Sequence, residues 1–343
     1  MEDRILPEEK RRNIPRLILV TPCYNEEELI EKTAAVMAAK LRRLAAEKKI
    51  TDSSRVLFVN DGSTDGTGRI LHDLCGRDPV FSVLSLSGNF GHQSAILAGM
   101  MFARDKADVV VTIDADLQQD IEALDEFISK YMDGCEVVYG IRNDRSADSF
   151  LKRFTANTYY NLLNALGGKV IKNHADYRLV SAKALEALSG YTEVNLFLRG
   201  LIPTMGFRSD VVYFDVKERE AGKSKYSFGK MLSLAMNGLT SFSTRPLRLL
   251  GELGFITALI GVIVGINEII DWSKGENVPG YTTILVALIV FSGVILMSLG
   301  VLGGYIAKIY METKRRPLYI IDNVVWKDDN GNEGGADDRN TCG

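Results

Sequence analysis

Two carboxylates spaced two residues apart, Asp114 and Asp116, follow an apolar run at residues 109–113, and the amide of Gln118 comes next. Such a run is typical of a buried strand that delivers its last side chains to the carboxyl end of a sheet, where open α/β folds place their ligands. Carboxylate and amide oxygens are hard donors that suit Mg²⁺ or Mn²⁺, and such an ion typically also binds substrate phosphates. We therefore predict a divalent metal site at these three residues. The alternative is that the acidic pair only caps a helix.

The elements that must position this pair alternate between strands and helices. The sequence predicts strands at residues 16–21, 55–60, 80–86, 109–113 and 136–141. After the first strand, the acidic residues from Glu26 begin a helical pattern that extends to about Glu47, because acidic side chains in a first turn favour the helix dipole. After the second strand, Thr64 or Asp65 is expected to cap the next helix. This order predicts an α/β fold with a doubly wound, mainly parallel sheet and helices on both faces.

The composition argues against nucleic-acid binding and indicates a reducing compartment. The chain has 343 residues, a charged fraction of 25% and a net charge of −3, which gives no sign of nucleic-acid binding. Its four cysteines are scattered without metal-ligand spacing, a pattern that suits a reducing compartment. The first seventeen residues are charged and lack an apolar segment, so we expect no cleaved signal peptide and a cytoplasmic N-terminal domain.

Long apolar segments near the C-terminus predict a membrane anchor. Residues 282–307 contain no charged side chain over 26 positions, about 39 Å as a helix against a hydrocarbon core of about 30 Å. Residues 253–266 are apolar but shorter, so a re-entrant or core helix is the alternative to a second span. Basic residues flank both outer ends, whereas the loop at 271–281 holds only Lys274. This asymmetry favours a hairpin with both ends in the cytoplasm.

Two amphipathic stretches, residues 149–166 and 226–242, are expected to form helices that pack on the domain or lie in the membrane interface. We favour the interface, because the second stretch leads almost directly into the first apolar segment. Beyond residue 325 the chain is polar and acidic, which predicts disorder. The expected organisation is an N-terminal extension at 1–15, a catalytic domain at 16–225, an interface helix and connection at 226–248, a transmembrane hairpin at 249–309 and a cytoplasmic tail at 310–343.

Several motifs in this order resemble a known family. Residues 21–27, 60–67, 89–95 and 114–118 look like the successive signatures of inverting family-two glycosyltransferases with a GT-A fold. Residues 176–179, 195–200, 219–226 and 313–317 resemble the polyprenyl-phosphate branch, which includes dolichyl-phosphate mannose synthases and bactoprenol glucosyltransferases. The match covers about residues 16–321 and is most similar to the bacterial bactoprenol type. It implies a homotetramer in the bacterial inner membrane, with undecaprenyl phosphate as acceptor and a UDP-sugar, UDP-glucose first, as donor.

The resemblance also implies roles for individual residues. The nucleotide is expected at Pro22, Tyr24, Glu26, Asp61 and Asp114, and the donor sugar at Gly91, His92 and Asp176. Tyr24 would stack on the base while the carboxylates accept hydrogen bonds from base N–H and ribose hydroxyls; the alternatives are a buried tyrosine and helix caps. Asp116, supported by Asp114 and Gln118, would hold the metal against the diphosphate and stabilise the leaving group. His92 contacts the donor or is a capped core histidine.

A lipid phosphate needs cationic partners, and arginine grips phosphate bidentately. The candidates are Arg142, Arg153, Arg178, Arg199, Arg219 and Lys225. The family pattern favours Arg142, Arg153 and Arg219, and any candidate has a solvated surface charge as its alternative. A phosphate monoester has a second pKa of about 6 and is already anionic in the cytoplasm. The enzyme therefore needs no dedicated general base to activate it. Asp176 binds a sugar hydroxyl or, against this expectation, acts as that base.

Two competing functions remain on sequence grounds. A processive polysaccharide synthase would carry a Gln-x-x-Arg-Trp motif, which neither Trp272 nor Trp326 provides. A catalytically idle scaffold that binds a nucleotide sugar or polyprenyl phosphate would tolerate loss of Asp116, whereas an enzyme would not. The residues therefore favour the transferase, with Asp114, Asp116 and Asp176 as its catalytic carboxylates.

Overall fold

The computed structural model describes residues 12–143, 174–191, 198–215 and 280–327, together with short stretches between 247 and 270. The chain divides into two compact units, the first made of residues 1–160, 169–225 and 317–343 and the second of 161–168 and 226–316. The amphipathic stretches predicted at 149–166 and 226–242 lie outside the described residues.

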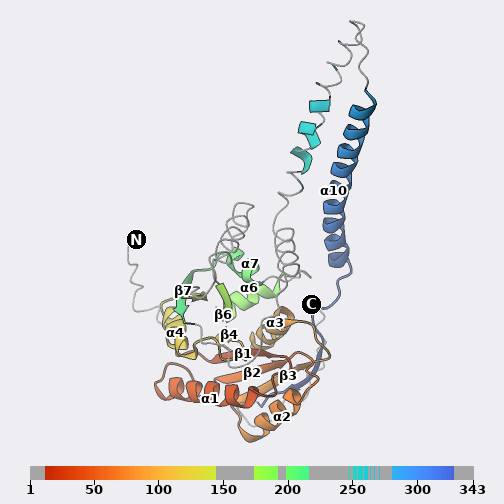
Figure 1. The fold of residues 1–343 in the computed structure, drawn as a ribbon. Coiled ribbons are helices and arrows are strands. Elements are labelled where there is room, and N and C mark those ends of the chain that lie inside the picture. Colours follow the sequence, from red (N-terminus) through yellow and green to blue (C-terminus); the bar gives the residue numbers. More distant parts are fainter. Residues whose placement is uncertain are drawn as a thin grey trace. The chain divides into compact units, whose positions relative to one another are not determined.

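The first unit is a mixed α/β domain (Figure 1). Its elements are β1 (Leu17–Cys23), α1 (Ile30–Ala46), β2 (Arg55–Asn60), α2 (Thr67–Arg77), β3 (Phe81–Leu86), α3 (His92–Ala103), β4 (Val109–Thr112), η2 (Ile121–Ala123), α4 (Leu124–Met132), β5 (Val137–Arg142), β6 (His174–Ser181), α6 (Ala182–Ser189), α7 (Leu198–Thr204), β7 (Ser209–Phe214) and β8 (Ile321–Val325). All the strands predicted from sequence are present, with ends that differ by a residue or two. The predicted α/β fold with a mostly parallel sheet is confirmed.

The eight strands form one sheet in the order β7-β5-β6-β4-β1-β2-β3-β8. β1 pairs in parallel with β2 and β4, β2 with β3, and β5 with β7, whereas β6 and β8 run antiparallel to their neighbours. The antiparallel strands matter for function, because they bring the start of a strand to the edge where the parallel strands end. In β6, Arg178 lies opposite Thr112 of β4, so the residues that precede Arg178 reach the loop that follows β4.

Each face of the sheet has its own hydrophobic core. All seven residues of β1 are buried, as expected for a central strand covered on both sides. Leu17 and Leu19 join the core under α1, α2 and α4, while Ile18 and Val20 join the core under α3, α6 and α7, which agrees with the helices above and below the sheet in Figure 1. Gly99 brings α3 close, since a Cβ there would lie 2.4 Å from Val20 Cγ1.

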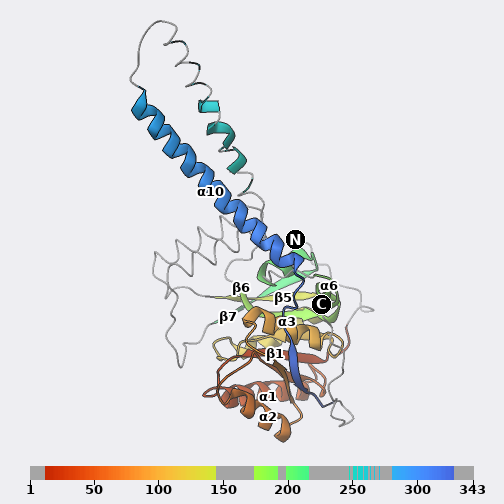
Figure 2. The same ribbon diagram turned by 90° about the vertical axis from the view of Figure 1, so that its right-hand side faces the viewer.

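Residues after the apolar C-terminal helix return to the sheet as β8, whose Ile321 pairs with Leu86 of β3 (Figure 2). Trp326 is 5% exposed and packs edge-on against Phe102 at 5.6 Å, with the Arg55 guanidinium 5.3 Å from its ring centre. The prediction of a tail at 310–343 does not include β8, and the disorder predicted beyond residue 325 does not fit Trp326, which is buried. β8 is a short, largely exposed strand that is recognisable only from its distant partner, β3.

The second unit contains α10 (Tyr281–Thr313), which confirms a helix over the apolar segment predicted at 282–307. Within it, Phe291–Thr313 is the one helix in the described part of the chain that is long and apolar enough to cross a membrane. A shorter apolar helix runs over Leu250–Gly261. The two-span hairpin remains a prediction.

Candidate active site

The loops after β1 and β2 are tied together by their own polar groups. Asn25, at φ 55°, donates its N–H to Ser63 Oγ at 3.1 Å and accepts from Thr64 N–H at 2.8 Å. Asp65 Oδ1 accepts from Thr67 N–H at 3.0 Å at the start of α2, but the N-cap position of this helix is Gly66, so neither Thr64 nor Asp65 is the cap residue that the sequence predicted. These bonds hold the carboxyl ends of two neighbouring strands as one surface.

The predicted nucleotide residues Pro22, Tyr24, Glu26 and Asp61 lie at the carboxyl ends of β1 and β2. Tyr24 is 45% exposed, which rules out the alternative of a buried tyrosine and leaves its ring available for stacking. Asp61 is 3% exposed, and its two oxygens accept from Phe90 N–H at 2.7 Å and Gly91 N–H at 2.9 Å. It therefore fastens the loop that leads into α3, where Gly91 has φ 90°. Pro22 lies buried within β1, and Glu26 donates its N–H to the Thr67 hydroxyl at 2.8 Å.

The loop that carries the three predicted metal ligands, Asp114, Asp116 and Gln118, follows β4 and is held on both sides. Thr33 of α1 donates its hydroxyl to Ala115 O at 2.7 Å. Asp116 Oδ1 accepts from Gln118 N–H at 3.1 Å. The cap of the next helix is Asp120, whose side chain accepts from Glu122 N–H, so the acidic pair at 114 and 116 is not that helix's cap.

Gln119, which the sequence analysis did not single out, contacts Asp114 twice. Its Oε1 accepts from Asp114 N–H at 3.1 Å, and its Nε2 donates to Asp114 Oδ2 at 2.6 Å. Gln119 is 3% exposed, whereas Gln118 beside it is only partly buried. The one signal in the sequence was the pair of adjacent glutamines, which does not indicate which of them points inward.

Asp176, at the start of β6, lies beside this loop and is 4% exposed. Arg199 of α7 grips it bidentately, with Nε to Oδ1 at 3.0 Å and Nη2 to Oδ2 at 2.7 Å. Arg178 Nη2 bonds Oδ1, and Gln93 Nε2 donates to Oδ2 at 3.2 Å. His92 Nε2 stands between the carboxylates, 3.6 Å from Asp176 Oδ2 and 3.5 Å from Asp114 Oδ1. The structure thus brings together Asp114, His92 and Asp176.

These contacts set the charge state of the site. Burial opposes the charge on Asp176, but the His92 hydrogen bond and the two guanidinium groups hold its pKa well below the ordinary value. Burial raises the pKa of Asp114, as do the Asp176 and Asp116 charges, against the pull of His92. Burial opposes protonation of His92, yet the Asp176 hydrogen bond and the Asp114 charge raise its pKa overall. Asp176 is therefore ionised and paired with two arginines, whereas burial disfavours the ionised form of Asp114.

The donor set fits a divalent ion that shares its ligands with a substrate. The described residues contain no group of three or more His, Cys, Asp or Glu side chains that would hold a metal by themselves. Mg²⁺ is commonly bound by one or two carboxylates plus substrate phosphates and water. Asp114 and Asp116 lie two residues apart in the loop after β4 and can supply those carboxylates. Asp176, engaged with two arginines, does not belong to this set.

The predicted acceptor residues are only partly brought together. Arg142 ends β5 and is exposed at the same edge of the sheet, and Arg199 is partly exposed. Arg178 is fully buried, and its Nε and Nη1 find no hydrogen-bond partner in the part of the chain that the structure describes. Direct contact between Arg178 and a lipid phosphate is therefore wrong; its guanidinium neutralises Asp176. Arg153, Arg219 and Lys225 lie outside the described residues.

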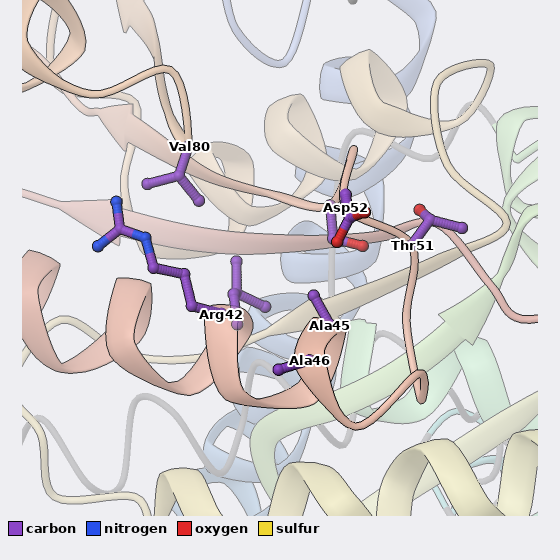
Figure 3. Close-up of a pocket in the computed structure, with 8 residues that line it drawn as sticks. Arg42, Ala45, Ala46, Thr51, Asp52 and Val80 are labelled. Carbon is purple, nitrogen blue, oxygen red and sulfur yellow. The ribbon is translucent and has the colours of Figure 1, made fainter.

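A separate pocket of about 240 Å³ lies at the amino ends of β2 and β3, opposite the carboxyl ends that carry the acidic site (Figure 3). It is lined by Arg42 and Ala45 of α1, by Thr51 and Asp52 before β2, and by Val80 before β3. Because these loops precede the strands, the pocket shares no residue with the acidic site at the carboxyl ends.

The amino-acid sequence of this chain is similar to those of known glycosyltransferases. A sequence profile of the family described as "Glycosyl transferase family 2" matches residues 18–189. An uncharacterised glycosyltransferase of Bacillus subtilis, YkoT, is 44% identical over 91% of this chain and 93% of its own length. The bactoprenol glucosyl transferase of Shigella phage SfV is 40% identical over 91% of this chain and 100% of its own. A solved structure of glucosyl-3-phosphoglycerate synthase from Mycobacterium tuberculosis is 16% identical, with a TM-score of 0.44, and covers 66% of this chain and 79% of that one.

Proposed function

The chain belongs to glycosyl transferase family 2, and from this premise we propose that it transfers a sugar from a nucleotide sugar to polyprenyl phosphate with inversion. The observation that carries the proposal is the acidic loop with Asp114 and Asp116 beside the neutralised Asp176, at the edge where α/β sheets bind ligands. The relatives named bactoprenol glucosyl transferase support undecaprenyl phosphate as the acceptor.

The donor would be UDP-glucose or another UDP-hexose. Tyr24 is exposed at the end of β1 and would stack on the base, while Glu26 and Asp61 lie in the two loops around it. A Mg²⁺ or Mn²⁺ ion held by Asp114 and Asp116, with Gln118 nearby, would supply charge neutralisation on the diphosphate. Gly91 and His92 open α3 next to both carboxylates, which supports a place for the sugar there.

The acceptor provides its own nucleophile. A phosphate oxygen forms the new bond to the anomeric carbon, the bond from that carbon to the diphosphate oxygen breaks, and the nucleoside diphosphate leaves with the electron pair. No proton has to be removed, because the monoester is already anionic. Asp176 would be a poor base, since its depressed pKa keeps it ionised but weakly basic. We assign it to orienting His92 and Arg199 by fixed charge, so that the protein acts by positioning and electrostatics.

Cations at the acceptor side would bind the lipid phosphate. Arg142 is exposed at the end of β5, and with Arg153 and Arg219 it forms the set that we favour, while Arg199 adds charge from α7. The apolar helix α10 supports attachment to the bacterial inner membrane. We further propose that it pairs with the apolar segment at 253–266 as a hairpin, that the catalytic domain faces the cytoplasm, and that the protein forms a homotetramer.

The test is incubation of the detergent-purified protein with undecaprenyl phosphate, Mn²⁺ and a panel of labelled nucleotide sugars, followed by counting of the lipid fraction. Label from one donor, absent with undecaprenol or after chelation, supports the proposal and identifies the sugar. Arg153→Ala should raise the apparent KM for undecaprenyl phosphate and leave that for the donor unchanged. If nucleotide and lipid bind but no donor yields labelled lipid, the proposal fails in favour of a scaffold that does not catalyse transfer.

A further inference from the structure

Adjacent glutamines in the loop after β4 point in different directions. Gln118 is partly exposed, while Gln119 is 3% exposed and lies within the domain. The residue before them, Leu117, has φ 56°, a left-handed conformation that is uncommon for a side chain of this kind and occurs most often where the fold imposes it. This turn separates the residue predicted to face the metal from the residue beneath it.

Gln119 holds Asp114 through both its backbone and its carboxylate. One primary amide accepts the N–H of Asp114 at 3.1 Å and donates to Oδ2 of the same residue at 2.6 Å. Two bonds from one rigid group fix the direction of the carboxylate as well as its position. Oδ1 is then directed toward His92 Nε2, 3.5 Å away.

A neutral amide is suited to this place for an electrostatic reason. Asp114 already shares this loop with Asp116, and Asp176 lies on the other side of His92, so a further acid at position 119 would add repulsion. A basic residue there would form an ion pair with Asp114 and compete with a cation for the carboxylate. Glutamine donates a hydrogen bond without adding or cancelling charge.

We propose that Gln119 is a positioning residue that aligns Asp114 for the divalent ion and the donor diphosphate. The inference rests on the proposed function for the identity of the donor. The contacts between Gln119 and Asp114 do not depend on that function. Groups that orient a metal ligand typically change metal affinity or activity by about 10–100-fold when they are removed. Gln119 acts through Asp114 and does not touch the substrate.

The experiment uses full-length protein in detergent and compares Gln119→Leu and Gln119→Glu with the wild type. Leucine fills similar space without a hydrogen bond, and glutamate keeps the shape but replaces the N–H donor by a charge. Mn²⁺ binding is titrated by electron paramagnetic resonance in the presence of UDP, and UDP binding without metal is measured by equilibrium dialysis. Ser181→Ala is the matched control, because Ser181 is 3% exposed and caps α6 at the far end of β6.

Both variants should raise the Kd for Mn²⁺ by about 10–100-fold while UDP binding without metal and the KM for the lipid acceptor stay within about twofold. Ser181→Ala should lower the melting temperature and leave Mn²⁺ binding unchanged. If Gln119→Leu has a lower melting temperature but binds Mn²⁺ as tightly as the wild type does, the inference is overturned. It is also overturned if the wild-type protein binds no Mn²⁺ in the presence of UDP. Wild-type protein that binds Mn²⁺ and UDP but glycosylates no lipid would refute the proposed function alone, and the Gln119 variants would still decide this inference.

Discussion

Neutralising the carboxylate of Asp176 should destabilise the catalytic domain. The loss of stability should be far larger than for an exposed carboxylate that also pairs with an arginine. Asp176 is 4% exposed and faces Arg178, which is fully buried, and Arg199. Loss of one partner from a buried ion pair leaves an uncompensated charge and costs about 3–5 kcal/mol. Domains of this kind have a free energy of unfolding of about 5–15 kcal/mol, so Asp176→Asn should lose a large fraction of it.

Asp105 offers a matched control within the same domain. Its oxygens accept from Arg104 Nε at 3.0 Å and Nη2 at 2.9 Å, the same bidentate geometry, but its side chain is 69% exposed. Exposed pairs contribute less than about 1 kcal/mol, and Asp105→Asn should therefore be nearly neutral. Because both carboxylates make the same bidentate contact with an arginine, the difference in stability loss between the two variants reports the effect of burial.

The assay is urea unfolding of metal-free protein, followed by the fluorescence of Trp326, which is buried, in a Trp272→Phe background. The pH dependence supplies a second readout. Because the folded pKa of Asp176 is lowered, its stabilisation is present above the unfolded pKa of about 3.9 and is lost as the pH falls below it. The difference between wild type and Asp176→Asn should be constant near pH 5 and shrink below about pH 4. Equal stability of the two proteins at pH 5 would refute the assignment of Asp176 as an ionised, buried anchor.

Three further predictions test other parts of the domain. Trp326→Ala should cost about 3–5 kcal/mol, since the ring is 5% exposed against Phe102; an unchanged melting temperature would show that β8 is not needed for the fold. Thr33→Val should leave Ala115 O without its donor, lower stability by about 1–3 kcal/mol and weaken Mn²⁺ binding in a titration with UDP; unaltered Mn²⁺ binding would mean that α1 does not position the loop. Asp116→Ala should reduce turnover by about a hundredfold or more at an unchanged melting temperature, and turnover within tenfold of wild type would contradict its role.

Local patterns were sufficient for much of the fold. The apolar runs before residues 60, 86 and 113 ended as strands within a residue or two of their predicted positions, because burial on both faces requires continuous hydrophobic sequence. β8 was missed for the opposite reason. It is a short, largely exposed edge strand whose partner, β3, lies far away in the sequence, and no local signal indicates such pairing.

The sequence was sufficient to predict which residues belong to the site, but not which of them contact one another. Asp176, Arg178 and Arg199 all appeared as candidates, yet their union in one ion network depends on the antiparallel register of β6 and on the position of α7. That register turned Arg178 from a lipid contact into a buried partner of Asp176. Gln119 was missed because the positive φ of Leu117 decides which glutamine points inward.

The central claim is that the acceptor phosphate itself becomes glycosylated, and ³¹P nuclear magnetic resonance of undecaprenyl phosphate tests it most directly. With the wild-type protein, Mn²⁺ and the active nucleotide sugar, the monoester signal should be replaced by a phosphodiester signal, with one nucleoside diphosphate released for each diester formed. Asp116→Ala should leave the monoester unchanged. Release of nucleoside diphosphate without any diester signal would contradict transfer to the lipid phosphate.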